Sequence, residues 1–137
     1  MNIFIVVKYR QGNDELTTLA NTLAAATQAV GHLPLVGWRE IRKRNFSSGR
    51  EWMSFIKTMI STCALLVLVY DESLHGGFVE LGIAYARAIP IWVLSRPGQM
   101  LSNSVGGCAE KIILYESTEA LYTHLVKAYQ SWSIKSP

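Results

Sequence analysis

The sequence predicts an α/β fold: a single-domain, flavodoxin-like or Rossmann-like three-layer sandwich around a five-stranded, mostly parallel sheet. Short runs rich in Val, Ile and Leu alternate with segments whose apolar residues recur at helical spacing, which is typical of βαβ units. The runs are continuously apolar, as in strands that are buried on both faces. The 137 residues suit one domain, and no linker or internal repeat divides them.

Five apolar runs have the length and composition of buried strands. The fourth contains Pro90 near its entry, where a strand tolerates proline. Five strands in a domain of this length favour the flavodoxin-like order, in which ligands lie beyond the carboxyl ends of the strands, near the switch between the first and the third. The predicted strands are residues 2–9, 33–37, 64–70, 89–94 and 111–114.

The segments between these runs repeat apolar residues every three or four positions, which predicts helices. Asn13 or Asp14 is placed to cap the first helix, and Ser117 is placed to cap the last. The stretch 38–50 is polar and is expected to be irregular, and 96–103 is expected to be a loop. The predicted helices are residues 14–30, 51–62, 77–87 and 117–132.

Composition narrows the class of protein. Half of the residues are hydrophobic and 17% are charged, which excludes a disordered chain and is compatible with the homodimer that we expect. The apolar runs are too short for a membrane helix, and the first residues lack the basic region of a signal peptide. Cys63 and Cys108 lack metal-ligand spacing, so we expect reduced thiols, a cytoplasmic location, and no metal or cofactor.

The net charge of +3 mildly favours anionic ligands. A basic cluster lies in the polar stretch, and we interpret it as a solvated loop, with a mobile lid that attracts a nucleotide phosphate as the alternative. No platform of interleaved aromatic residues accompanies it, so nucleic acid is not expected as a partner. The cluster consists of Arg39, Arg42, Lys43, Arg44 and Arg50.

The segment 71–84 is the most informative part of the chain. The third predicted strand ends in Asp71 and Glu72, two glycines follow at Gly76 and Gly77, and Glu80 stands near the start of the next helix. Catalytic carboxylates and phosphate-binding amides are often presented in this way. The plainer alternatives are a carboxylate that stabilises the helix dipole and glycines that adopt positive φ in a turn.

Two motifs resemble one enzyme family. Residues 80–84, Glu-Leu-Gly-Ile-Ala, are similar to the Glu-Leu-Gly-x-Ala segment of the nucleoside 2-deoxyribosyltransferase superfamily. Residues 94–97 and 101–107 resemble its 2′-deoxynucleoside 5′-monophosphate N-glycosidase branch, which carries Arg-Pro after the fourth strand and then a Leu-Ser segment whose serine binds the 5′-phosphate. The resemblance implies that residues 1–137 form a single domain of this superfamily.

The resemblance further implies that Glu80 attacks the anomeric carbon of a nucleotide or nucleoside and forms a glycosyl-enzyme intermediate. Water would then release the sugar, whereas a nucleoside acceptor would make the protein a transferase. A carboxylate suits this chemistry because the transition state resembles an oxocarbenium ion. The leaving base needs a proton or hydrogen bond from a second group, and we assign that role to Asp71, with Glu72 as the alternative.

Further residues are predicted to bind the substrate. Lys8 and Tyr9 stand at the end of the first predicted strand and could hold a phosphate and stack on a base, although a solvated strand end is the alternative. The phosphate site implied by the resemblance includes Arg96 and Ser102, the serine often being donated by a neighbouring subunit. The alternative for Arg96 is a surface ion pair, and the alternative for Ser102 is a plain helix cap. The other predicted binding residues are Gly76, Gly77 and Asn103.

The chain departs from the family pattern at several positions. Ile56 and Ala64 occupy the places of two acidic residues, and Phe4 occupies the place of a tyrosine. Two other hypotheses therefore stand beside the first. One is a nucleotide-binding module without catalysis, and the other keeps the chemistry but changes the substrate to a ribonucleotide or an NAD-like dinucleotide.

Overall fold

A computed structural model describes the backbone of residues 1–135 and the side chains of residues 1–132. Five strands form one sheet in the order β2-β1-β3-β4-β5, and every neighbouring pair is parallel. This is the flavodoxin-like order that the sequence predicts. The strands are β1 (Asn2–Val6), β2 (Leu33–Val36), β3 (Leu65–Val69), β4 (Ile91–Ser95) and β5 (Lys111–Leu114).

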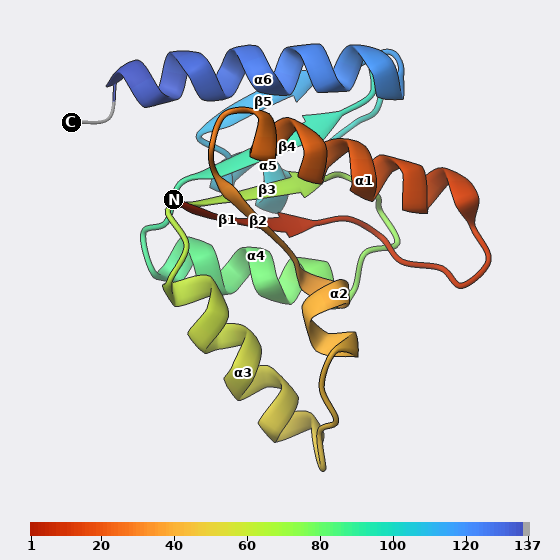
Figure 1. Ribbon diagram of the computed structural model, residues 1–137, viewed down its shortest axis with the longest axis vertical. Coiled ribbons are helices and arrows are strands. Elements are labelled where there is room, and N and C mark those ends of the chain that lie inside the picture. The colour runs from red at the N-terminus through yellow and green to blue at the C-terminus, as the bar shows by residue number, and fades with distance from the viewer. Residues whose placement is uncertain (136–137) are drawn as a thin grey trace.

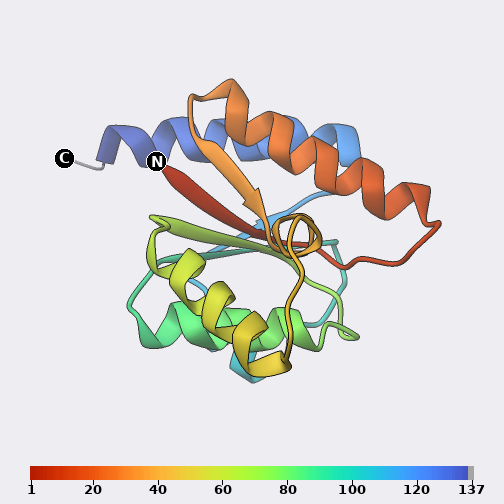
Figure 2. The same cartoon turned by 60° about the horizontal axis from the view of Figure 1, so that its bottom comes forward.

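Helices cover both faces of the sheet and complete the three-layer sandwich, as Figures 1 and 2 show. The helices α1 (Asp14–Ala29) and α6 (Thr118–Lys135) lie side by side on one face. The opposite face carries α3 (Gly49–Ser61), α4 (Gly76–Ala86) and the short α5 (Asn103–Cys108). A short helix, α2 (Gly37–Arg42), follows β2 directly at the carboxyl edge of the sheet.

The protein has two hydrophobic cores, one on each face of the sheet, because side chains of each strand point alternately to the two faces. Side chains alternate along β1, so that Ile3 and Ile5 pack under α1 and α6 whereas Phe4 and Val6 pack toward α3 and α4. All five residues of β3 are buried, as expected for a strand covered on both faces. On the α1–α6 side, the hydroxyl groups of Thr27 and Tyr129 lie 2.8 Å apart and satisfy each other inside the core.

The sequence analysis missed two short helices. Within residues 38–50, α2 occupies the first part, and α3 begins at Gly49 because the Ser48 hydroxyl accepts a hydrogen bond from the Glu51 amide. After the predicted loop 96–103, the short helix α5 covers part of the sheet. The first strand also ends three residues earlier than predicted, at Val6, so Val7, Lys8 and Tyr9 belong to the loop. Among the described residues, no helix is long and apolar enough to cross a membrane.

Candidate active site

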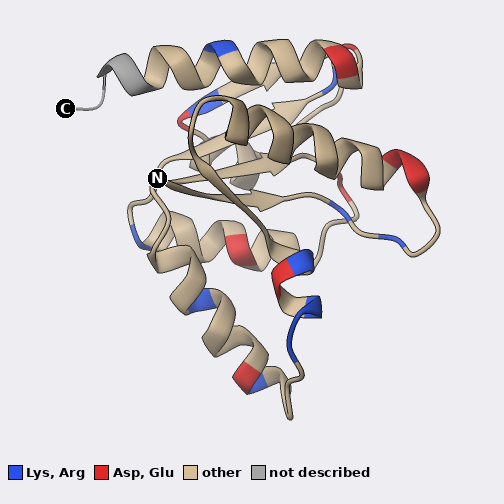
Figure 3. Ribbon diagram, viewed as in Figure 1, with Lys and Arg blue, Asp and Glu red and all other residues tan. Residues whose placement is uncertain are grey.

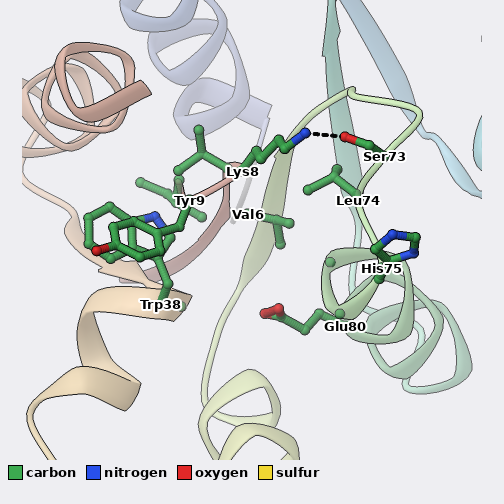
Figure 4. Close-up of a pocket in the computed structure, with 13 residues that line it drawn as sticks. Val6, Lys8, Tyr9, Trp38, Ser73, Leu74, His75 and Glu80 are labelled. Atoms are coloured by element: carbon green, nitrogen blue, oxygen red, sulfur yellow. Dashed lines mark hydrogen bonds between the residues drawn. The ribbon is translucent and has the colours of Figure 1, made fainter. Parts of the chain in front are cut away.

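A cavity of about 340 Å³ opens at the carboxyl edge of the sheet, beside the switch between β1 and β3. The end of β1, the start of α2, the loop after β3 and the start of α4 form its walls. The Glu80 carboxyl group extends from α4 toward α2 in this space (Figure 4). The lining residues are Ile5, Val6, Val7, Lys8, Tyr9, Gly37, Trp38, Ser73, Leu74, His75, Gly76, Gly77 and Glu80.

The Glu80 carboxyl group is held in a tight apolar slot. A Cβ atom added to Gly37 would lie 2.9 Å from Glu80 Oε2 and 2.9 Å from Phe4 Cζ, so only glycine leaves room for both groups. Glu80 Oε2 is buried and has no hydrogen-bond partner among the described residues. Burial therefore raises the pKa of this carboxyl from its usual 4.5 to about 7.

Two aromatic rings and two arginines form a stack at the α2 side of the cavity. The rings of Tyr9 and Trp38 lie 4.5 Å apart between centroids. The Arg39 guanidinium lies over the Trp38 ring, and Arg42 lies over the Tyr9 ring while donating a 2.6 Å hydrogen bond to its hydroxyl. Trp38 Nε1 is buried and has no acceptor among the described residues. The stack thus closes the α2 side of the cavity.

Sequence reasoning missed Gly37 and Trp38 as site residues. It placed Gly37 at the end of a strand and Trp38 at the start of an irregular stretch. The available signal was the pair Gly-Trp directly after the second strand, since that position must lie at the ligand edge of a flavodoxin-like sheet.

Asp71 lies in a polar cluster rather than in an apolar slot. Its carboxylate accepts hydrogen bonds from the backbone amide and the hydroxyl of Ser73, at 2.8 and 2.6 Å. Lys8 Nζ lies 3.9 Å from Asp71 and also donates to the Ser73 hydroxyl (Figure 4). Burial favours the neutral acid, but the bonds from Ser73 and the charges of Lys8 and Arg10 outweigh it, so the pKa of Asp71 is lowered.

A second cavity, of about 510 Å³, lies on the other side of Lys8, toward α1 and α6. Asp71 and Arg96 line it, and Val7 and Lys8 line both cavities. Arg96 donates a 3.0 Å hydrogen bond to the Glu116 carbonyl and lies over the Tyr115 ring. The structure therefore places Glu80, Lys8 and Tyr9 around one cavity and Asp71 and Arg96 around its neighbour.

The remaining predicted residues are placed as follows. Gly76 and Gly77 line the Glu80 cavity, but neither has positive φ, so the turn interpretation of these glycines is wrong. Gly77 is needed for close packing, since a Cβ there would lie 2.8 Å from Val6 Cγ1. Ser102 caps α5 by accepting a hydrogen bond from the Val105 amide, and neither Ser102 nor Asn103 lines the two cavities of this chain.

Two positions at which the sequence departs from the family pattern, Phe4 and Ile56, lie in apolar surroundings. Phe4 and Ile56 are buried in the core beneath α3 and α4. Because Phe4 has no hydroxyl group, the ring beside the Glu80 slot cannot donate a hydrogen bond to the carboxyl group.

The basic cluster lies on α2, on the segment that follows it and at the start of α3, as Figure 3 shows. Individual aromatic side chains lie beside it: the Arg44 guanidinium lies over the Phe55 ring, and the centroid of the Phe46 ring lies 5.9 Å from that of Trp52. The sequence alone did not predict this grouping, because Phe46 and the helix α3 are separated by a turn. Within the described residues, no three His, Cys, Asp or Glu side chains gather as metal ligands.

Comparison with known proteins identifies similar folds. No protein-family model and no curated protein sequence matches the chain. Among solved structures, BlsM has a TM-score of 0.71 at 17% identity, over 99% of this chain and 94% of that one. A 2-deoxyribosyltransferase of Bacillus psychrosaccharolyticus has a TM-score of 0.69 at 14% identity, over 89% and 90%. The CMP N-glycosidase BcmB of Clostridium botulinum has a TM-score of 0.67 at 15% identity, over 91% and 98%. At these identities the likeness shows a shared fold.

Proposed function

We propose that the chain is an enzyme that cleaves the bond between base and sugar in a nucleotide or nucleoside, with Glu80 as the nucleophile. The single observation that carries this proposal is the Glu80 carboxyl group, which lies in a cavity at the ligand edge of the sheet and whose Oε2 has no hydrogen-bond partner within residues 1–132. Similarity in fold to a 2-deoxyribosyltransferase and to a CMP N-glycosidase supports the same class of reaction.

The electrostatics of the cavity suit this chemistry. As the base departs, positive charge develops on the sugar ring, and an ionised Glu80 next to it stabilises that charge before it bonds to the anomeric carbon. The apolar slot strengthens this attraction because little solvent screens it. With a pKa of about 7, Glu80 is partly ionised at neutral pH, and a positively charged transition state favours its ionised form further.

Asp71 serves the proposed site by positioning another group. A carboxylate with a lowered pKa is ionised at neutral pH and holds no proton for the leaving base. We instead assign Asp71 and Ser73 to fixing the Lys8 ammonium between the two cavities, where it can attract the phosphate of a nucleotide.

A homodimer and a cytoplasmic location belong to this proposal as predictions. Several large apolar side chains on α3 and α4 are exposed, among them Trp52, Val79 and Tyr85, and they favour a contact with another subunit. Ser102 and Asn103, which face neither cavity in their own chain, are then candidates to complete the site of a partner. Sedimentation analysis of the purified chain would measure its oligomeric state.

A nucleotide-binding module without turnover is the second candidate. Phe4 and Ile56 favour it, because they replace polar groups of the family pattern with side chains that are buried in the core. Tight binding of a nucleotide without release of base over long incubation would establish this function in place of the first.

The test is a panel of nucleosides and nucleotides scored for free base by chromatography. Wild-type protein should release base from at least one member, and Glu80→Gln should lower the rate by about a thousandfold or more, since a neutral amide cannot stabilise the cationic transition state. Glu72→Gln is the matched control, because Glu72 is an exposed residue on the loop before α4 and lines neither cavity. Equal rates for Glu80→Gln and the parent would refute the proposed nucleophile.

A further inference from the structure

The second cavity, which Asp71 and Arg96 line, is not used by the cleavage reaction proposed above. It is larger than the Glu80 cavity, about 510 Å³ against about 340 Å³, and both volumes are typical of ligand sites. Val7 and Lys8 line both cavities, so the two spaces adjoin at the carboxyl edge of the sheet. One ligand can therefore extend from the first cavity into the second.

Lys8 stands at the junction of the two cavities. Its ammonium group lies 3.9 Å from the Asp71 carboxylate and donates a hydrogen bond to the Ser73 hydroxyl (Figure 4). In the proposed reaction the anomeric carbon lies at Glu80 and the phosphate lies at Lys8. Any group attached to the far side of that phosphate then extends into the second cavity.

The surroundings of Lys8 favour a phosphate with a single negative charge. A terminal phosphate monoester carries a charge of about −1.5 to −2 at neutral pH. A phosphate with a second substituent has lost the more weakly acidic proton and keeps a charge of about −1. The lowered pKa of Asp71 keeps its carboxylate ionised beside Lys8, and this carboxylate repels a dianion more strongly than a monoanion.

The outer wall of the second cavity is acidic. Asp14, Glu15 and Glu119 line it, are exposed, and form no ion pair within residues 1–132. Carboxylates accept hydrogen bonds from hydroxyl groups and attract ammonium groups, whereas they repel further phosphates. The group that continues beyond the phosphate should therefore be neutral or positively charged and carry polar hydrogen atoms or a cationic centre.

Arg96 offers a second cationic contact in the same cavity. Its guanidinium donates a 3.0 Å hydrogen bond to the Glu116 carbonyl and lies over the Tyr115 ring. A guanidinium has several N–H donors, so these contacts leave donors for an oxygen atom of a ligand. Since Lys8 and Arg96 both line the second cavity, they are suited to the two halves of a diphosphate.

We propose that the second cavity binds a further part of the substrate, so that the preferred substrates are nucleotides whose phosphate is linked onward to a neutral or cationic polar group. A sugar or an amino alcohol joined through a diphosphate belongs to this class. The proposal rests on the function proposed above and names its substrate class. Glu80 acts on the bond between base and sugar as before, and the second cavity contributes binding without taking part in the chemical step.

The experiment compares substrates that share one base and one sugar and differ beyond the first phosphate. With cytosine as the base the series is CMP, CDP and CDP-choline, and with guanine it is GMP, GDP and GDP-mannose. The third member should have a kcat/KM for base release at least about fivefold above those of the first two. A third member no better than the monophosphate or the free diphosphate, in both series, overturns the second binding site and leaves the glycosidase function intact.

Variants of the acidic wall test the contact with the onward group. Glu119→Gln and Asp14→Asn should each lower the ratio of kcat/KM between CDP-choline and CMP about two- to fivefold, because the choline cation loses an attractive charge. Glu116→Gln is the matched control, since it removes the same charge between β5 and α6 but lines neither cavity. A ratio that Glu119→Gln leaves unchanged, or lowers no more than Glu116→Gln does, overturns the assigned contact.

Binding measurements separate failure of this inference from failure of the proposed function. Calorimetric titration of Glu80→Gln, in which turnover does not interfere, gives Kd for each member of the two series. If the wild-type protein releases no base from any nucleotide, the proposed function is overturned. Tighter binding of CDP-choline or GDP-mannose than of the corresponding monophosphate and diphosphate then still supports the second binding site, whereas equal or weaker binding overturns it as well.

Discussion

Two carboxylates stand on either side of Lys8 at the same edge of the sheet, and their environments are opposite. Asp71 accepts two hydrogen bonds from Ser73 and lies near two cationic side chains, so its pKa is lowered. Glu80 Oε2 lies beside Phe4 and Gly37 and has no hydrogen-bond partner in the part of the chain that the structure describes, and burial raises the pKa of this carboxyl group to about 7. One is a satisfied carboxylate that organises its surroundings, and the other is available to a ligand.

This difference shows that position at the ligand edge does not by itself define a role. Both residues lie within eleven positions after the end of β3, and both satisfy the rule that functional groups gather where parallel strands end. The two carboxylates differ in whether nearby hydrogen-bond donors bind their oxygen atoms, and this difference sets the opposite shifts of their pKa values. A strained or unpaired group indicates function more strongly than a paired one.

The largest expected effect is an opposite dependence of stability on pH when each carboxylate is neutralised. The pKa of Glu80 is higher in the folded than in the unfolded chain, so the free energy of unfolding of the wild-type protein falls as pH rises from about 4.5 to about 7. Because Glu80→Gln cannot ionise, it should avoid this loss of stability, which amounts to up to about 3 kcal/mol at pH 8. Urea unfolding at pH 5 and pH 8 would measure the difference.

Asp71→Asn should act in the other direction. Its lowered pKa stabilises the fold above the pKa of the unfolded chain, and this contribution disappears as pH falls through the folded value. The side chain is 37% exposed, so solvent screening should keep the loss at pH 7 below about 1 kcal/mol. The same sign of effect for Asp71→Asn and Glu80→Gln at pH 8 would contradict the contrast between the two sites.

The next effect is expected from Gly37→Ala. The added methyl group would lie 2.9 Å from both Glu80 Oε2 and Phe4 Cζ, so it must displace the carboxyl group, the ring or the backbone. Overpacking of this kind should lower the free energy of unfolding by about 1–3 kcal/mol and reduce base release. Gly82→Ala is a suitable control, since a Cβ at that position of α4 meets no atom within 4 Å. Comparable losses in the two variants would argue against a tight slot around Glu80.

The smallest effect is expected from Phe4→Tyr, which brings a hydroxyl group to the ring beside Glu80. A hydrogen bond to the ionised carboxylate should lower its pKa by about one and make Glu80 more like Asp71. The ascending limb of the pH profile of kcat/KM should then move to lower pH. A limb that does not move would show that the hydroxyl group fails to reach the carboxylate.

Much of this fold was predictable because its signals are local. The continuous apolar run of β3 and the helical spacing within residues 14–30 predicted their elements, and the alternation of strands and helices predicted the parallel sheet. The short helices α2 and α5 were missed, because six residues carry too little periodicity to distinguish a helix from a polar loop.

The candidate site was predictable only in part. Glu80 was proposed because it stands near the start of the helix after the third strand and matches a family motif, and Lys8 and Tyr9 because they stand at the end of the first predicted strand. The division between the Glu80 and Asp71 cavities was not predictable, since it depends on the direction in which side chains point from the loop after β3. The roles of Gly37 and Trp38 were missed for the same reason, because α2 brings them to β1 and α4 from another part of the chain.

The sequence by itself determined the class of fold, the strands that meet at the ligand edge and the residues that stand there. These follow from hydrophobic periodicity and from the constraints on parallel connections, which act along the chain. Only the tertiary structure decided which carboxylate is paired and which is free. Hydrogen bonding and burial are set by neighbours from β1, α2 and α4, and a pKa follows from those neighbours rather than from the residue type.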